Sequence, residues 1–573
     1  MSKISKYFDY RLDKNKKGFL SVSLRGMPLL RLTATNKGTA FTLSERRELG
    51  LEGLLPAAVL SLDDQVNKLY ESFSRQVDEI EKYQFLRATQ DRNEVAFYAL
   101  LARHLEEMMP IVYTPTVGKA VQQFSALFQA PRGLTISTQN IERVDECLDN
   151  YPWNDVRIIV ATDSSAILGL GDQGQGGLAI CVGKLALYTS GGGISPFHTM
   201  PVNLDVGTDA QHLLDDKSYL GVQHERLNGK PYFEFMDSFV NHVERKWPKA
   251  VIQWEDFSKG VAFEVLERYQ DKIPCFNDDI QGTGAVVLSG ILSACKMKGE
   301  SLADQRIVVV GAGAGGVGVA RALLAGMIAE GLSKEQARKQ LFVVDVDGLV
   351  VEGITQDTYM LSVSQYETTY ADWDIAGEVP SLEEVIENSG ATALMGFTGC
   401  AGLFNKPMVE RLMQNVERPI IFPLSNPNSN CEATPQDLAD WTEGKAILAT
   451  GSPFPLVTFN GNDIRVGQGN NAFVFPGIGF AAVLGKCRRI SDAMVLESAY
   501  ALSEFTEEHY LSKGMIYPPV SALREVSISV TARVLKVALE DGSSDREELK
   551  SVDLYAYVRS RSWNSEYLPF VAA

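Results

Sequence analysis

Two patterns of apolar and polar residues follow one another along the chain and predict its elements. Residues 43–130 place apolar side chains three and four positions apart, as in 62-LDDQVNKLYESFSRQVDEIEKYQFL-86, which is typical of amphipathic helices. Beyond them, short apolar runs end in acidic or glycine-rich turns, which indicates strands. The clearest are 155-DVRIIVATD-163 and 249-KAVIQWEDF-257, and a helical pattern over 258–270 follows the second.

From residue 303 onward, strand and helix patterns alternate regularly. Each strand is a short apolar run that stops at a small or polar turn, which predicts a parallel, doubly wound sheet buried on both faces. Such sheets bind ligands beyond the carboxyl ends of their strands. The fold class is therefore predicted as multidomain α/β. The five strand candidates begin 307-IVVVGAG, 341-LFVVDVDG, 392-TALMGFTG, 419-PIIFPLSNP and 446-AILATGSP.

The length of 573 residues exceeds what one hydrophobic core supports, so several domains are expected. A mainly helical N-terminal region leads into a first α/β domain, which a later segment completes. A doubly wound, Rossmann-type domain lies between these two segments, and a tail closes the chain. The expected boundaries are 1–130 for the helical region, 131–280 with 468–540 for the first α/β domain, 281–467 for the Rossmann-type domain and 541–573 for the tail.

Composition narrows the function classes. The chain is 45% hydrophobic and 22% charged, as in folded globular proteins, and its net charge of −18 argues against nucleic acid and anionic membranes as partners. The longest apolar stretches are interrupted by glycine, proline or arginine, so no membrane span is expected. Seven scattered cysteines without a CxxC pair fit a reducing compartment. We expect a cytoplasmic protein, with the mitochondrial matrix as the alternative.

A glycine turn predicts a dinucleotide site. Gly311, Gly313 and Gly316 form a GxGxxG pattern that follows a strand and opens a helix, so backbone and helix N-terminus can face a pyrophosphate. Asp345 ends the next strand and can bind both ribose hydroxyls. No lysine or arginine lies between residues 345 and 358 to neutralise a 2′-phosphate, which favours NAD over NADP. The alternative is that the glycines only tighten a turn.

Two acidic pairs, Glu255-Asp256 and Asp278-Asp279, each follow an apolar run. Solvated loops are the plain alternative, because acidic pairs are common on surfaces. Their position at the ends of strands instead predicts three or four oxygens that converge at the rim of a core. Such oxygens suit Mg²⁺ or Mn²⁺, and the lack of Cys/His clusters disfavours zinc.

Lys184 and Tyr113 carry weaker signals. Lys184 lies in the apolar run 176-GGLAICVGKLALY-188, where a lysine either reaches solvent along its alkyl stem or is buried beside an acid. Burial would lower its pKa and make it a general base. Tyr113 lies between two prolines in 108-MMPIVYTPTVG-118, where a packed loop aromatic is the simpler interpretation.

Taken together, these segments resemble the malic enzyme family, and the resemblance runs from residue 36 to residue 570. Nine blocks occur in the family's order, so chance is a poor explanation. The blocks are MPIVYTPTVG, ILGLGDQG, VGKL, WEDF, FNDDIQGTG, the glycine turn, PLSNP, TGSPF and GQGNNAFVFPGIG.

The resemblance implies NAD-dependent oxidative decarboxylation of malate to pyruvate and CO₂, and it implies roles for individual residues. Lys184 takes the proton from the malate hydroxyl, Asp278 pairs with Lys184 and tunes it, and Tyr113 protonates the enol carbon. The Mn²⁺ or Mg²⁺ ligands implied are Glu255, Asp256 and Asp279. The residues implied to contact substrate and nicotinamide are Asn426, Asn470 and Asn471. The family forms homodimers and homotetramers, and the same is expected here.

One position departs from the family pattern. Malic enzymes usually carry an arginine just before ILGLGD, but the segment here is 162-TDSSAILGLGD-172, with Ala166 in its place. Alanine cannot clamp a substrate carboxylate, and Arg226 is one candidate to replace the arginine. Malolactic enzymes, which the resemblance also includes, lack that arginine and return the hydride to give lactate. Malolactic activity is therefore the alternative, and a catalytically weakened regulator that binds a dinucleotide or an acid is the minor one.

Overall fold

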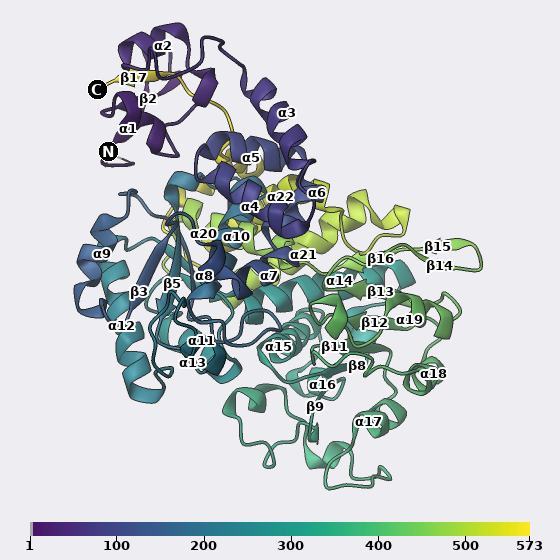
Figure 1. The fold of residues 1–573 in the computed structure, drawn as a ribbon. Coiled ribbons are helices and arrows are strands. Elements are labelled where there is room, and N and C mark those ends of the chain that lie inside the picture. Colours follow the sequence, from purple (N-terminus) through teal and green to yellow (C-terminus); the bar gives the residue numbers. More distant parts are fainter. Residues whose placement is uncertain (1–3) are drawn as a thin grey trace. The chain divides into compact units, whose positions relative to one another are not determined.

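The computed structural model describes residues 4–573, which form two compact units. The first unit extends to Gln253 and also contains Tyr557–Ala573, while the second is Trp254–Ala556 (Figure 1). The chain therefore leaves the first unit once and returns to it at its C-terminal end.

A group of helices occupies the N-terminal half of the first unit, as the three-and-four spacing predicts. Side chains that accept hydrogen bonds from the first turn set where helices begin: Ser61 accepts from the backbone N–H of Asp64, and Asn93 accepts from that of Ala96. The helices are α1 (Gly26–Arg31), α2 (Leu43–Glu48), α3 (Leu62–Phe73), α4 (Glu79–Gln90), α5 (Glu94–Arg103), α6 (Leu105–Val112), α7 (Thr116–Gln122) and α8 (Phe124–Leu127).

The rest of the first unit is built on strands in the order β3-β5-β4-β6, of which β3 and β4 are both parallel to β5. Helix α10 packs against the two central strands, β4 and β5, whose residues are all buried. The strands are β3 (Leu134–Ser137), β4 (Ile158–Thr162), β5 (Thr199–Asp205) and β6 (Val251–Trp254), at whose end the second unit begins. The helices are α9 (Val144–Asn150), α10 (Leu178–Ser190), α11 (Gln211–Leu214) and α12 (Gly229–Lys246).

A small sheet joins the two ends of the chain within the first unit. Strands β1 (Phe8–Leu12) and β2 (Gly18–Val22) are antiparallel, and β17 (Phe570–Ala572) pairs with β2 in parallel (Figure 1). A buried ion pair supports this junction: Lys37 Nζ lies 2.5 Å from Glu45 Oε1, which also accepts from the Phe570 backbone N–H. The pairing of β17 with β2 leaves no local pattern, because these two strands lie at opposite ends of the sequence.

The second unit contains the seven-stranded sheet β10-β9-β8-β11-β12-β13-β16. Its β8, β9, β11, β12 and β13 are the five strands predicted from the apolar runs, and they are parallel. A core of buried valine, leucine and isoleucine packs on them. The strands are β8 (Ile307–Val310), β9 (Leu341–Asp345), β10 (Gly348–Leu349), β11 (Ala393–Gly396), β12 (Ile420–Pro423), β13 (Ile447–Thr450) and β16 (Val466–Gln468). The predicted α/β class with a doubly wound sheet is confirmed.

Helices α14, α20, α21 and α22 of the second unit pack on one another. The helical segment 278–298, which includes α14, is long and apolar enough to cross a membrane. Of its apolar 18-residue stretch, however, 78% is buried inside the described chain, as in the core helix of a folded protein. The bounds are β7 (Cys275–Asn277), α13 (Lys259–Tyr269), α14 (Thr283–Lys298), α15 (Ala314–Ala329), α16 (Lys334–Arg338), α17 (Leu382–Asn388), α18 (Lys406–Asn415), α19 (Pro435–Trp441), β14 (Val457–Phe459), β15 (Asn462–Ile464), α20 (Phe475–Gly485), α21 (Asp492–His509) and α22 (Leu523–Glu540).

Candidate active site

Two glycines of the turn between β8 and α15 are required by the local backbone. Gly311 has a φ of 99°, a region that L-residues rarely adopt, and a Cβ added there would lie 2.6 Å from the carbonyl oxygen of Phe397. A Cβ added at Gly316 would lie 1.8 Å from the carbonyl oxygen of Gly311. The turn can therefore close only with glycine at both positions.

Gly313 differs from its two neighbours. It is the residue before α15, its φ of −75° is open to any residue, and a Cβ added there meets no atom within 4 Å. The first turn of α15 carries no acidic side chain. Open space in front of a helix N-terminus is where backbone N–H groups and the helix dipole bind phosphate, so this turn fits a dinucleotide.

Asp345 lies beside this turn, at the end of β9. Its Oδ1 accepts a hydrogen bond of 3.3 Å from the Ala312 backbone N–H. Arg321 of α15 directs its guanidinium to the Tyr359 carbonyl and the Ser362 hydroxyl. The Asp345 carboxylate thus lies beside the glycine turn, while the Arg321 guanidinium is engaged with Tyr359 and Ser362.

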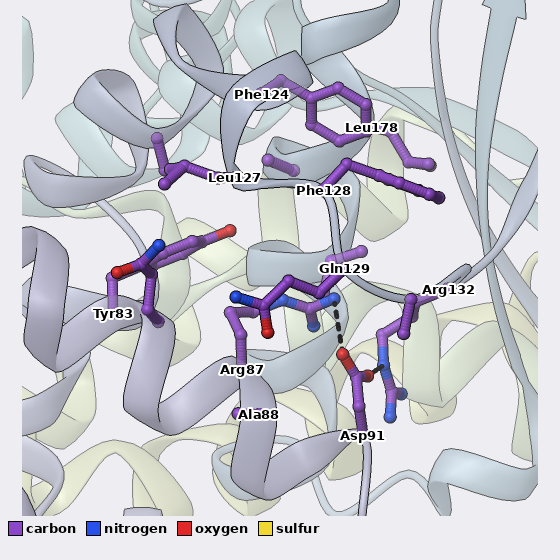
Figure 2. A pocket seen from close by; sticks show the side chains of 15 residues that line it. Tyr83, Arg87, Ala88, Asp91, Phe124, Leu127, Phe128, Gln129, Arg132 and Leu178 are labelled. Atoms are coloured by element: carbon purple, nitrogen blue, oxygen red, sulfur yellow. Dashed lines mark hydrogen bonds and ion pairs between the residues drawn. The ribbon is translucent and has the colours of Figure 1, made fainter. Parts of the chain in front are cut away.

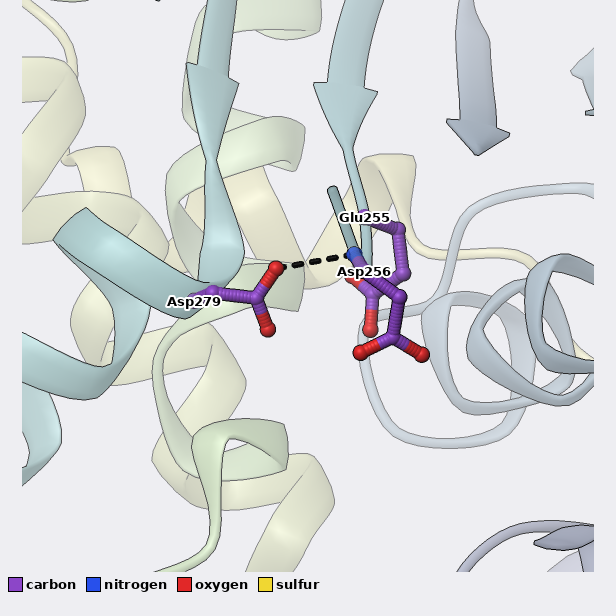
Figure 3. A group of neighbouring side chains, drawn as sticks. All are labelled: Glu255, Asp256 and Asp279. Carbon is purple, nitrogen blue, oxygen red and sulfur yellow. Dashed lines mark hydrogen bonds between the residues drawn. The ribbon is translucent and has the colours of Figure 1, made fainter. Parts of the chain in front are cut away.

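Three carboxylates gather in the second unit, at the ends of two strands (Figure 3). Glu255 and Asp256 are 2% and 5% exposed and follow β6 directly, while Asp279 is half-buried and follows β7. One oxygen from each lies within 4.8 Å of the others. Charges of one sign repel at this spacing in a desolvated place, and a hard divalent cation with oxygen ligands relieves the repulsion. The donor set therefore fits Mg²⁺ or Mn²⁺.

The backbone of Asp256 is held in an uncommon conformation. Its φ is 56°, in the left-handed region, and its N–H donates to Asp279 Oδ2 at 2.8 Å. A non-glycine residue in this region costs about 1–2 kcal/mol, so surrounding contacts must maintain it. The hydrogen bond from Asp256 to Asp279 connects the two predicted acidic pairs, which lie more than twenty residues apart in the sequence.

The FNDDIQG turn orients Asp278 in the second unit. Asn277 Oδ1 accepts from the Ile280 N–H at 2.9 Å, and the chain then makes a π-helical turn over Asp278–Gly282 before α14. Asp278 is fully buried, and Asn471 Nδ2 donates to its Oδ2 at 2.9 Å and to Thr283 Oγ1 at 3.0 Å. A Cβ at Gly282 would lie 2.0 Å from Asp278 Oδ1, so glycine makes room for this carboxylate.

In the first unit, Lys184 is buried. Its exposure is 1%, so the alternative in which it reaches solvent is wrong, and the Tyr113 ring centroid lies 5.1 Å from its Nζ. Gly183 permits this approach, because a Cβ there would lie 2.7 Å from the Val112 carbonyl oxygen and 3.2 Å from the Tyr113 ring. Tyr113, which follows α6, is 6% exposed. A buried amine and a buried phenol are thus neighbours.

The other predicted asparagines make local contacts in the second unit. The Asn426 side chain accepts a hydrogen bond from the Ser452 hydroxyl, and Gly451 leaves room for its amide. Asn470 Oδ1 accepts from the Ala472 N–H at 2.9 Å and begins a short helical turn. The structure therefore places Asn471, and not Asn470, against the Asp278 carboxylate.

Arg226 does not offer a spare positive charge in place of the arginine missing at Ala166. Its guanidinium makes 2.7 Å and 3.2 Å contacts with the Asp172 carboxylate and donates to the Asp163 carbonyl oxygen at 2.8 Å. Burial alone lowers the pKa of Arg226, but the Asp163 and Asp172 carboxylates outweigh burial and raise it. The arginine therefore braces the 163–172 loop with its charge compensated.

Glu432 is a functional candidate that the sequence patterns miss. It is fully buried, and its Oε1 accepts from the Thr398 N–H at 2.8 Å and from the Ser425 hydroxyl at 2.5 Å. It thereby ties the turn after β11 to the turn after β12, which carries Asn426. A single glutamate in the loop 431-CEATPQ-436 gives no pattern that could have revealed this role.

The doubly wound sheet and its open glycine turn define a dinucleotide-binding enzyme. Two family models match the chain: "Malic enzyme, N-terminal domain" over residues 90–270 and "Malic enzyme, NAD binding domain" over residues 280–539. The NAD-dependent malic enzyme of Aliivibrio salmonicida is 45% identical over 91% of this chain and 93% of that protein. That of Aliivibrio fischeri is 43% identical over 96% and 98%.

Solved structures agree with the fold. The malic enzyme of Entamoeba histolytica superposes with a TM-score of 0.56 at 21% identity, over 89% of this chain and 90% of that one. At this identity the likeness supports the architecture alone. The family models and the curated relatives go further: this chain belongs to the malic enzyme family.

Proposed function

We propose that the protein catalyses the oxidative decarboxylation of (S)-malate to pyruvate and CO₂, with reduction of NAD to NADH and dependence on Mn²⁺ or Mg²⁺. The observation that carries the proposal is the gathering of three carboxylates in the unit that also holds the dinucleotide turn. A metal site and a hydride-acceptor site together suit an acid that is first oxidised and then loses CO₂.

The second unit holds the proposed cofactor and metal residues. Gly311, Gly313 and Gly316 admit the pyrophosphate to the N-terminus of α15, and Asp345 accepts from the ribose hydroxyls. Asn426 contacts the nicotinamide end and the substrate. Glu255, Asp256 and Asp279 hold the divalent ion, which when bound supplies Lewis acidity toward the malate oxygens.

The proton-transfer roles are assigned to buried groups. Lys184 accepts the proton of the C2 hydroxyl as hydride leaves C2 for NAD, and Tyr113 donates a proton to C3 after CO₂ departs. Their burial and mutual contact support this assignment, since both groups are shielded from bulk water. Asp278 tunes Lys184, and Asn471 holds the Asp278 carboxylate in place. Asn470 is assigned with Asn471 to the substrate.

Replacing Lys184 tests these roles. Lys184→Ala is expected to abolish NADH formation from malate, NAD and Mn²⁺ while NAD and Mn²⁺ still bind, as measured by calorimetry. Lys119→Ala is the matched control, because this exposed lysine of α7 pairs with the exposed Glu79. Unchanged turnover in Lys184→Ala would show that the base is another group.

A second candidate function rests on Ala166. With alanine there and Arg226 held by carboxylates, the site lacks the family's arginine, as malolactic enzymes do. Malolactic activity converts malate to lactate and CO₂ with NAD retained. The two reactions differ in whether NADH is released.

Assembly and compartment complete the proposal. We propose a homodimer or homotetramer on the strength of the family resemblance, and a cytoplasmic location on that of the bacterial relatives. Light scattering on the purified chain tests the assembly, and a monomeric mass at assay concentration would contradict it.

A further inference from the structure

Glu432 lies beneath two turns of the second unit and does not reach the surface itself. It is fully buried, whereas Thr398 and Ser425, which it contacts, are half-buried in the turns after β11 and β12. Its Oε1 accepts from the Thr398 N–H at 2.8 Å, the Thr398 hydroxyl at 2.9 Å and the Ser425 hydroxyl at 2.5 Å. A Cβ at Gly396 would lie 2.4 Å from Glu432 Cδ, so glycine at the end of β11 makes room for the carboxylate.

The surroundings of Glu432 differ from those of carboxylates that cations balance elsewhere in the chain. In the pocket of the first unit that Figure 2 shows, for example, Asp91 pairs with both Arg87 and Arg132. Glu432 has neutral donors instead, and no ion pair joins it to any residue of the described range 4–573. A buried carboxylate without a cation is stable only while its hydrogen-bond donors stay in place. The carboxylate and the two turns therefore fix one another.

The turn after β11 also contacts the glycine turn after β8. These two strands are parallel neighbours, with Gly396 in register with Val310, so their turns begin at the same level. A Cβ at Gly311 would lie 3.2 Å from the Thr398 nitrogen, the same group that donates to Glu432. A shift of the Thr398 backbone would therefore be felt at the glycine turn.

The turn after β12 carries Asn426 and is connected on both sides. The hydroxyl of Ser425, the residue before it, accepts from the Gly399 N–H at 2.9 Å while it donates to Glu432. The Asn426 side chain accepts from the Ser452 hydroxyl in the turn after β13. The Glu432 carboxylate thus belongs to a hydrogen-bonded network that includes the turns after β11, β12 and β13.

The order of the strands places the two halves of a bound dinucleotide on opposite sides of the glycine turn. Asp345 ends β9 on one side of β8, and β11 and β12 follow on the other side. Doubly wound sheets bind dinucleotides outside the carboxyl ends of their strands. With the pyrophosphate at the glycine turn and the adenosine ribose at Asp345, the nicotinamide half extends over the turns after β11 and β12.

We infer, given the NAD site proposed above, that Glu432 is a positioning residue for the nicotinamide half of NAD: it fixes Asn426 relative to the glycine turn and does not touch the cofactor. Its loss is therefore expected to weaken the binding of NAD. ADP-ribose lacks the nicotinamide and needs only the glycine turn and Asp345, so its binding is expected to persist.

Calorimetric titration of the full-length protein with NAD and with ADP-ribose tests this role without turnover. Glu432→Met keeps a side chain of similar length that accepts no hydrogen bond from the turns, so NAD is expected to bind about tenfold or more weakly. The Kd for ADP-ribose is expected to change less than about threefold. Glu432→Gln keeps an oxygen for the donors that Oε1 binds and is expected to retain most of the NAD affinity. Glu410→Met is the matched control, because this exposed glutamate of α18 pairs with Lys406.

Ser425→Ala is a second variant with a smaller effect on the fold. It removes one donor to Glu432 and the acceptor of the Gly399 N–H, so NAD affinity is expected to fall while ADP-ribose affinity holds. Unchanged NAD affinity in both Glu432→Met and Ser425→Ala would overturn the proposal. Equal losses for NAD and ADP-ribose would also overturn it, since Glu432 would then only hold the domain together, and so would a loss in Glu432→Gln as large as in Glu432→Met. No binding of either ligand by the unmodified protein would instead refute the proposed NAD site, and the role of Glu432 with it.

Discussion

Replacing Gly313 and Gly316 separately by alanine distinguishes a phosphate site from a merely tight turn. The added methyl at Gly313 meets no protein atom within 4 Å, so the fold is expected to lose at most about 1 kcal/mol through the poorer helix N-cap. The same methyl at Gly316 would lie 1.8 Å from the Gly311 carbonyl oxygen, so the backbone must move. Such overpacking costs about 1–3 kcal/mol or more.

The two variants are therefore expected to differ: Gly313→Ala weakens NAD binding with little loss of stability, whereas Gly316→Ala destabilises the fold itself. The Gly313 methyl occupies the space in front of α15 and displaces the pyrophosphate from the backbone N–H groups. The loss of one charge-assisted hydrogen bond is about 1.5–3 kcal/mol, which raises KM for NAD about tenfold to hundredfold. Steady-state kinetics with NAD varied, together with thermal unfolding of the NAD-free protein, measure both effects. A Gly313→Ala variant with the normal KM for NAD would refute the reasoning, since the open space would then have no ligand.

Three further changes test the metal site, the Asp278 turn and a buried histidine. Asp256→Asn removes one carboxylate but keeps a residue that tolerates the left-handed backbone, so the affinity for Mn²⁺ is expected to fall more than about tenfold while thermal stability without metal holds or rises. Asp463→Asn, which changes an exposed aspartate, is the control. Equal calorimetric Kd values for Mn²⁺ in the two variants would refute the site. Asn471→Ala removes the hydrogen bond to Asp278, so kcat/KM for malate is expected to fall about tenfold or more. Thr283→Val spares that hydrogen bond and is expected to lower kcat/KM less. Equal losses of kcat/KM in the two variants would contradict the positioning role of Asn471. Burial, together with the nearby charge of Arg157, lowers the pKa of His198 from 6.5 to about 4. The folded state therefore favours the neutral imidazole, and up to roughly 3 kcal/mol of the free energy of unfolding, fully present above pH 6.5, is lost as the pH falls toward 4. His198→Gln is expected to flatten the denaturant-measured stability across that window, and an unchanged slope would refute it.

The sequence predicts the central sheet of the second unit well, because strands buried on both faces are short apolar runs with marked ends. The runs that begin at Ile307, Leu341 and Pro419 contain β8, β9 and β12. The edge strands β10 and β16 were not predicted, since two or three residues in partly exposed positions leave no periodic signal. Strand β17 was not predicted for another reason: it pairs with β2, which lies at the opposite end of the chain.

In the candidate site, too, residues in local sequence patterns were predicted, and residues defined by distant contacts were not. The glycine turn and the acidic pairs are local patterns, and the structure gathers Glu255, Asp256 and Asp279 from two of them. Whether Lys184 is buried could not be settled from sequence, because an apolar run accommodates both a buried lysine and one that reaches solvent. Glu432 had no local signal, since its role lies in contacts with the distant Thr398.

The analysis of products from malate tests the central proposal most directly. Purified protein with (S)-malate, NAD and Mn²⁺ is predicted to release pyruvate and CO₂ with one NADH per malate consumed, followed by NADH absorbance and by chromatography of the acids. Lactate formed in place of pyruvate, with no free NADH, would contradict the oxidative proposal and establish the malolactic reaction that Ala166 allows.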